Sequence, residues 1–165
     1  MAKKKSIKTN VARLLDAARI PYTLIEYPVD EEHLEAQHVA DSIGEDINQV
    51  YKTLVMRGDK TGLIVGVIPG NREIDLKKAA KASGNKKVEM IHMKELLPLT
   101  GYIRGGCSPI GMKKPLPTYF QQDCMEWPQI YVSAGQRGLQ VYIAPADLVG
   151  YVGGTISDIT ADSAS

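Results

Sequence analysis

Apolar residues recur with the spacing of a helix near the start of this chain. Counted from Val11, the apolar residues Leu14, Leu15 and Ala18 follow at intervals of three, four and seven, so a helix would carry all four on one face. Similar patterns, closed by a glycine or opened by a proline, predict helices over residues 9–19, 35–43, 76–83 and 145–152, and a helical turn over residues 93–97.

Shorter segments alternate between apolar and polar residues, or are apolar throughout, as strands are. Gly58-Asp59-Lys60-Thr61 lies between two of them and is a hairpin signal. The predicted strands cover residues 22–27, 50–57, 62–68, 87–91, 116–120, 130–133, 139–143 and 155–159. Short strands with interspersed helices predict an α/β fold of the α+β type around a strongly curved, mixed sheet. With no internal repeat or linker, residues 1–165 are expected to form a single domain.

Composition narrows the class of protein. A chain of 165 residues is short for two domains, and 44% hydrophobic with 24% charged residues is typical of a globular protein. No apolar run reaches about 18 residues, which predicts no membrane span. The basic residues 1–8 have no apolar stretch behind them, so we expect a flexible N-terminus rather than a secretory signal. Two cysteines are too few for a disulfide framework, which points to the cytoplasm.

The net charge of +1 conceals local clusters. Lysines gather in residues 3–8, 77–87 and 113–114, and an acidic run covers residues 30–35. The clusters can be an ordinary solvated surface, or the basic side of a divided surface that meets a polyanion. With a pI near 7.7, any contact with nucleic acid should be weak and sensitive to salt.

Two glycine-rich runs stand beside predicted strands. Gly101 to Gly111 holds four glycines and a Ser-Pro step, and Ser133 to Leu139 holds two more glycines. Glycine admits positive φ and lets a ligand approach backbone N–H groups closely, so these runs predict the walls of one small polar site. Neither run has the spacing of a dinucleotide or Walker motif, and the three histidines lack the spacing of a zinc site. We therefore expect no cofactor and no metal.

Lys52 fits its surroundings worst. The strand period places it with Leu54 and Met56, opposite Tyr51 and Val55, so both faces are largely apolar, as in a central strand. One interpretation is a lysine that extends its ammonium into water. The other is an ammonium held at the wall of a pocket, where it binds a phosphate or carboxylate or polarises a carbonyl.

Ser108 and Cys107, in the first glycine run, have side chains that could act in chemistry. Ser108 precedes a proline and could orient a ligand, serve as a nucleophile with a distant partner, or simply belong to a turn. Cys107 could be a nucleophile, but a buried, inert thiol is the better interpretation at a strand end.

Several segments together resemble the YbaK/EbsC family, free-standing relatives of the editing domain inserted in bacterial prolyl-tRNA synthetases. The resemblance covers residues 10–159. It is carried by Tyr51-Lys-Thr-Leu, Asp75-Leu-Lys-Lys-Ala-Ala-Lys, Lys86-Lys-Val-Glu-Met, Thr100-Gly-Tyr-Ile-Arg-Gly-Gly-Cys-Ser-Pro-Ile-Gly-Met-Lys-Lys and Tyr131-Val-Ser-Ala-Gly-Gln-Arg-Gly-Leu.

The resemblance implies a mixed α/β domain with a partly closed sheet, and a set of site residues. The family's pocket lysine matches Lys52, and a tyrosine that ends its first strand matches Tyr27. The family's first glycine loop matches Gly105, Gly106, Ser108 and Gly111, and its second loop matches Ser133, Gly135 and Gly138. Gln140 stands where close relatives often carry an aspartate, and only His33 and Leu34 are offered where relatives often carry an aromatic residue. Both departures bear on amino-acid specificity rather than on the reaction.

The resemblance further implies a trans-editing enzyme that deacylates mischarged tRNA, in the closest branch Cys-tRNA(Pro). In that branch the substrate's own thiol is thought to attack the ester, so that the protein supplies no nucleophile. The expected partners are the acceptor end of mischarged tRNA and prolyl-tRNA synthetase. Two alternatives stay open: hydrolysis by water of another small aminoacyl-tRNA such as Ala-tRNA(Pro), and a non-catalytic module that binds tRNA or a synthetase.

Overall fold

The computed structural model describes residues 9–161, so the basic segment 1–8 lies outside the described residues. Five α-helices are present in that range: α1 (Asn10–Ala18), α2 (Ala36–Ile43), α3 (Leu76–Ser83), α4 (Leu96–Thr100) and α5 (Pro145–Val152). Three short 3₁₀ helices accompany them: η1 (Ile47–Gln49), η2 (Met93–Glu95) and η3 (Gln122–Glu126). The strands are β1 (Thr23–Glu26), β2 (Tyr51–Gly58), β3 (Gly62–Pro69), β4 (Val88–Met90), β5 (Thr118–Gln121), β6 (Ile130–Ser133), β7 (Leu139–Ile143) and β8 (Thr155–Ser157).

The ends of the helices follow local chemistry that can be read in the sequence. The Thr9 hydroxyl accepts a hydrogen bond from the Ala12 N–H at the start of α1. The Asp75 carboxylate accepts from the Lys77 and Lys78 N–H groups at the start of α3, which ends at the left-handed Gly84. The predicted α3 and α5 have the observed bounds, and the predicted α1 and α2 are one residue too long at one or both ends.

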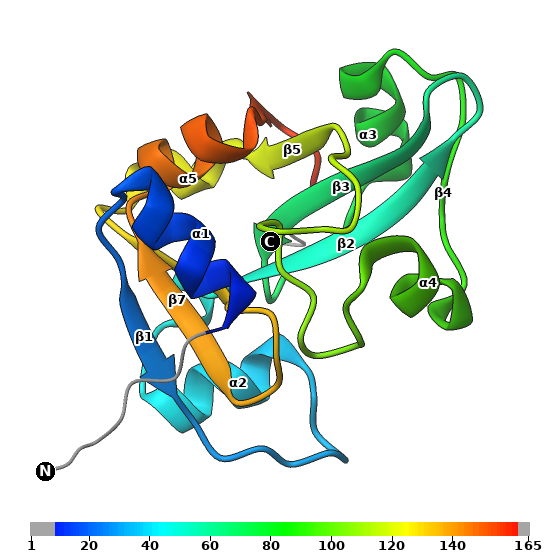
Figure 1. Cartoon of the computed structure of the whole chain (residues 1–165). Helices are drawn as coiled ribbons and strands as arrows, with labels where there is room; N and C mark the ends of the chain where they lie inside the picture. Colours follow the sequence, from blue (N-terminus) through cyan, green and yellow to red (C-terminus); the bar gives the residue numbers. More distant parts are fainter. Residues whose placement is uncertain (1–8, 162–165) are drawn as a thin grey trace, which may run out of the picture.

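The strands form two sheets rather than one. A five-stranded mixed sheet has the order β4-β2-β3-β5-β8, and a three-stranded antiparallel sheet has the order β1-β7-β6 (Figure 1). A parallel bridge between Val50 and Tyr131 joins them. The mixed α/β prediction is therefore confirmed, while the single curved sheet is corrected to two sheets that meet at this bridge.

Four observed strands, β1, β4, β5 and β8, are shorter than the predicted ones, and two of them have a clear local cause. β5 begins at Thr118 rather than Leu116, because Pro115 and Pro117 have no N–H to donate to a neighbouring strand. β8 ends at Ser157 rather than Ile159, because the next residues turn their backbone groups toward other partners.

The main core lies between the two sheets and is mostly aliphatic. Val132 and Val141 of the three-stranded sheet pack in one cluster with Val55 and Val65 of the five-stranded sheet. Helix α1 lies beside β7 and closes this cluster with Val11 and Leu15 (Figure 1). Phe120, the one phenylalanine of the chain, is completely buried there. The core thus holds the two sheets in a fixed relation.

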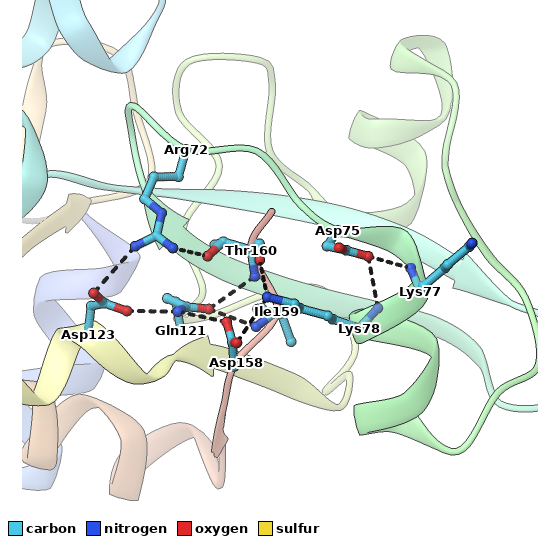
Figure 2. A network of polar contacts seen from close by, with 9 residues as sticks. All are labelled: Arg72, Asp75, Lys77, Lys78, Gln121, Asp123, Asp158, Ile159 and Thr160. Atoms are coloured by element: carbon cyan, nitrogen blue, oxygen red, sulfur yellow. Dashed lines mark hydrogen bonds and ion pairs between the residues drawn. The ribbon is translucent and has the colours of Figure 1, made fainter. Parts of the chain in front are cut away.

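A network of polar contacts, here called the C-terminal clasp, ties residues 158–160 to the rest of the fold (Figure 2). The Gln121 side chain is 1% exposed, and its Oε1 accepts from the Ile159 N–H at 2.7 Å and the Thr160 N–H at 3.2 Å. Its Nε2 donates to Asp123 and Asp158. The other side chains of the clasp are Arg72, which donates to Asp123 and Thr160, and Lys78, which donates to Asp158 and the Thr160 carbonyl.

Within residues 9–161, each helix is too short or too polar to cross a lipid bilayer.

The clasp predicts that Gln121→Leu destabilises the fold. Leucine would leave two buried backbone N–H groups and the partners of the amide unsatisfied, which should lower the free energy of unfolding by about 3 kcal/mol. Urea denaturation followed by circular dichroism measures the change. The neighbouring exposed Gln122→Leu is the matched control and should change stability by less than about 0.5 kcal/mol. Equal stability of the two variants would contradict the role given to the clasp.

Candidate functional site

A cavity of about 320 Å³ lies where the two sheets meet. Val50 and residues 51–55 of β2 supply one wall. Leu34, Glu35 and, from α2, Ala36 and Val39 supply another. The remaining lining residues are Gly70, Met90, Ile91, Met93, Leu96, Arg104, Gly105, Cys107, Ser133 and Gln140. The size is at the lower end for pockets that hold a small organic ligand.

The cavity exists because one edge of β2 is incompletely paired. β3 pairs with β2 from Tyr51 to Gly58, but on the other edge β4 pairs only from Met56 onward. At the opposite end, the bridge from Val50 to Tyr131 brings in the second sheet. Between these two points the edge of β2 borders the cavity.

Lys52 lies on a strand with a neighbour on each side, as predicted, and it lines this cavity. Its side chain is 26% exposed, and its Nζ lies 3.8 Å from Oε2 of Glu73, a side chain that is 83% exposed. Such an exposed counter-ion holds an ammonium only weakly. This weak ion pair leaves the Lys52 ammonium free to take a second partner.

The two glycine runs pack directly against each other. A Cβ on Gly106 would lie 3.0 Å from the Gln136 Cα and 3.2 Å from the Arg137 N, so only glycine allows this approach. The Arg137 Nε donates a 2.8 Å hydrogen bond to the Arg104 carbonyl. The two runs are thus in contact, and Gly105 of the first and Ser133 of the second line the cavity.

Other predicted loop residues lie behind the cavity rather than in its wall. Ser108 is completely buried, and its Oγ accepts from the Ile110 N–H at 3.2 Å, which is the turn role. Gly111 and Gly135 both have positive φ, and a Cβ on either would lie 3.0–3.2 Å from the Tyr102 ring system. These residues fix the conformation of the loops and do not line the cavity.

Tyr27 and Gly138 join the end of the first strand to the second loop. The Tyr27 N–H donates to the Gly138 carbonyl at 3.0 Å, and the Tyr27 side chain packs with the cluster between α2 and the three-stranded sheet. Neither residue belongs to the lining of the cavity. They anchor the second loop beside it.

Ser133 and Gln140 are cross-strand neighbours on β6 and β7 and form a polar part of the wall. The Ser133 Oγ accepts from the Gly135 N–H at 3.1 Å. The Gln140 Oε1 is buried, and so is the Thr53 Oγ1 in the wall made by β2. Neither of these two atoms has a hydrogen-bond partner within the described part of the chain.

Cys107 is buried in the wall, as predicted, and its environment keeps the thiol neutral. Burial raises the pKa of the Cys107 thiol to about 12. A thiol nucleophile needs the opposite shift, toward the thiolate. The structure therefore gives Cys107 the surroundings of a packing residue.

Sequence reasoning missed an apolar wall formed by Met90, Met93 and Leu96. An ion pair holds this wall in place: Arg57 Nη2 on β2 lies 2.8 Å from Glu95 Oε1, and the second Glu95 oxygen accepts from the His92 N–H. The hydrogen bond from Arg57 lowers the pKa of Glu95, and that carboxylate raises the pKa of Arg57 in turn. No periodic signal marks the wall, since its residues come from a short strand and a helical turn.

The predicted basic surface, which covers α3, the turn after it and residues 113–114, contains lysines with and without partners of their own among residues 9–161. Lys78 is bound within the clasp, and Lys113 donates to the Pro98 carbonyl at 3.1 Å. The exposed members of the predicted surface are Lys77, Lys81, Lys86, Lys87, Lys113 and Lys114. Across residues 9–161, no group of three or more histidine, cysteine or acidic side chains is arranged to hold a metal ion.

Comparison with known proteins adds an independent observation. The family model of the aminoacyl-tRNA editing domain matches residues 30–151. EbsC of Enterococcus faecalis, named as a candidate Cys-tRNA(Pro)/Cys-tRNA(Cys) deacylase, is 52% identical over 161 residues, which are 97% of this chain and 98% of that protein. A segment of the proline–tRNA ligase of Thermosipho africanus is 28% identical over 78 residues, 47% of this chain and 14% of the ligase.

Solved structures share the fold. A candidate trans-editing enzyme for prolyl-tRNA synthetase superposes with a TM-score of 0.79 at 24% identity, over 94% of this chain and all of that one. The hypothetical protein APE2540 superposes with a TM-score of 0.84 at 20% identity, over 92% of this chain and 99% of that one. At such low identity the likeness concerns the fold alone.

The burial of both cysteines predicts slow alkylation of the folded protein. Burial raises the pKa of Cys107 to about 12 and that of Cys124 to about 11, so both stay protonated at pH 8. Iodoacetamide at pH 8, followed by mass spectrometry, should modify them at least about a hundredfold more slowly than in urea. Rapid labelling of Cys107 in the folded protein would mean that the thiol is reactive.

Proposed function

This chain belongs to the aminoacyl-tRNA editing domain family, and we propose that it acts in trans to deacylate Cys-tRNA(Pro). The observation that carries the proposal is the cavity that Lys52 lines beside two glycine loops in contact with each other, in a chain 52% identical to a candidate deacylase over nearly its full length. The similarity to a proline–tRNA ligase segment supports prolyl-tRNA synthetase as the partner that supplies the tRNA.

The chemistry required is modest because an aminoacyl ester is already activated. A site that orients the ester and stabilises the oxyanion with backbone N–H groups and one cation can suffice. In the proposed site, Lys52 supplies the cation, and the first glycine loop borders the same space. The Lys52 ammonium would contact the ester oxygen or the terminal phosphate of the tRNA.

For a cysteinyl ester, we propose that the substrate provides the nucleophile. Its sulfur forms a bond to the ester carbonyl carbon, the bond from that carbon to the ribose oxygen breaks, and the thiol proton passes to the ribose oxygen. The products are a cyclic thioester and a tRNA with a free terminal hydroxyl. Two features of the protein support this route: the neutral Cys107 thiol and the Ser108 hydroxyl that is buried in its own turn.

Hydrolysis by water of a small aminoacyl group such as alanyl remains the competing reaction. It would release the free amino acid and no cyclic thioester. Analysis of the released product by mass spectrometry therefore separates the two routes.

The role given to Lys52 predicts that Lys52→Ala slows single-turnover deacylation of Cys-tRNA(Pro) about a hundredfold, or about 3 kcal/mol of transition-state stabilisation. Lys52→Arg should recover only part of the rate, since a planar guanidinium needs more room than an ammonium. Lys60→Ala in the exposed hairpin is the matched control and should keep the wild-type rate. If Lys52→Ala is folded by circular dichroism and cleaves as fast as wild type, the site assignment is wrong.

The exposed lysines of α3 and the following turn predict salt-dependent binding of tRNA. Each phosphate neutralised by a side chain contributes about −0.7 to −0.9 to the slope of log K against log salt. Replacing Lys86 and Lys87 by glutamine should therefore reduce the slope by about 1.5, measured by fluorescence anisotropy with uncharged tRNA. Arg13→Gln on the exposed side of α1 is the control. An unchanged slope in the double variant would show that these lysines are only a solvated surface.

A further inference from the structure

We infer that Gln140 binds the α-ammonium group of the substrate, with Thr53 as a second oxygen in the same cavity. The inference rests on the proposed deacylation of an aminoacyl-tRNA and names the part of the aminoacyl group that the cavity reads.

Gln140 is a buried polar residue, and burial of a polar side chain without a hydrogen-bond partner is unfavourable. It lies on β7, with Ile25 of β1 as its partner on one side and Ser133 of β6 on the other. Its side chain is 5% exposed and lines the cavity, and its Oε1 has no hydrogen-bond partner within residues 9–161. Buried side-chain oxygens of folded proteins nearly always accept a hydrogen bond. The missing donor is therefore expected from a molecule that enters the cavity.

The reacting end of an aminoacyl-tRNA limits the choice of donor. The ester oxygens only accept hydrogen bonds, and the neighbouring ribose hydroxyl and the cysteine thiol are neutral donors. The α-ammonium donates three hydrogen bonds and bears a full charge. Hydrogen bonds that involve a charged group are about twice as strong as neutral ones. The last torsion of a glutamine side chain is broad, so the amide can turn its oxygen toward such a group at little cost.

Lys52 gives the cavity a direction. Successive side chains of a strand point to opposite faces, so Lys52 and Thr53 leave β2 on opposite sides. The Lys52 ammonium repels the substrate's ammonium and attracts the ester oxygen. Three residues that line the cavity contribute buried, unpartnered oxygens: Tyr51, Thr53 and Gln140. The Tyr51 hydroxyl interacts electrostatically with Asp123, Cys124 and Arg72, none of which lines the cavity, so the Thr53 Oγ1 and the Gln140 Oε1 are the oxygens assigned to the ligand. An aminoacyl ester bound with its ammonium toward the Thr53 and Gln140 oxygens gives these oxygens a donor and keeps the ammonium away from Lys52.

Glu35 is the competing partner for the ammonium, because its carboxylate also belongs to the lining. It is exposed, however, and lies 3.8 Å from His33. A solvated carboxylate discriminates less than a buried oxygen, since water competes for it. Gln140 rather than Glu35 is therefore assigned to the α-ammonium, and variants of both residues are compared.

The test measures binding of two stable probes by isothermal titration calorimetry. One is adenosine whose 3′ oxygen is replaced by an amide-linked cysteinyl group, and the other carries 3-mercaptopropionyl, which lacks only the α-amine. Both probes keep the thiol and the amide N–H. Wild type should bind the first about tenfold more tightly than the second. Gln140→Met should bind the two equally, Thr53→Val should reduce the preference, and Gln140→Glu should increase it.

Gln122→Met, the same change at an exposed position, should keep the full preference. Circular dichroism checks each variant, and Gln140→Glu provides a second readout if Gln140→Met fails to fold. A preference that persists in folded Gln140→Met, or that Glu35→Gln abolishes, would overturn the inference, as would failure of wild type to bind the amine-bearing probe. Single-turnover assays with Cys-tRNA(Pro) test the proposed function separately, because the binding ratio requires no turnover.

Discussion

Strand β2 is fully paired with β3 on one edge and paired only near its ends on the other. β4 holds the end from Met56 to Gly58, and the bridge to Tyr131 holds the beginning. If the second sheet continued along β2, its strands would fill the space that the cavity occupies. The partial pairing therefore creates a wall that is rigid, polar along its edge and open to a ligand.

The rest of the fold stabilises this arrangement from outside the cavity. The turn after β3 contributes Gly70 to the lining and brings Glu73 near Lys52, and the same turn is bound by the C-terminal clasp. The Ala161 N–H donates to the Glu73 carbonyl at 2.9 Å, and Arg72 donates to Thr160. On the other side, the Arg57–Glu95 pair fixes the methionine wall. Elements distant in sequence thus define the position of one ammonium.

Local signals in the sequence predicted most of the elements but not their assembly. Helix α3 begins after the capping Asp75 and ends at Gly84, and helix α5 begins at Pro145. These are local signals that do not depend on distant residues. The clasp could not be foreseen, because Gln121 bonds to residues 38 and 39 positions away and nothing in the pattern selects those partners. The division into two sheets depends equally on long-range pairing.

The candidate site was predicted in part for the same reason. Lys52 stood out as a charge in an apolar strand, and the glycine runs stood out by composition. Which members of the runs face the cavity depends on how the loops pack: Gly105 lines it, while Gly111 lies against α1 and Tyr102. Thr53 and Met90 gave no signal, since each is ordinary for a strand.

The central claim is that the cavity on the open edge of β2 holds the reacting end of the tRNA. A crystal structure of the protein with the amide-linked cysteinyl adenosine bound tests this most directly. The account predicts electron density for the cysteinyl group between Lys52 and Gln140, with its carbonyl oxygen within hydrogen-bond distance of the Lys52 Nζ. Density for the cysteinyl group elsewhere on the protein, with the cavity filled by water, would contradict it.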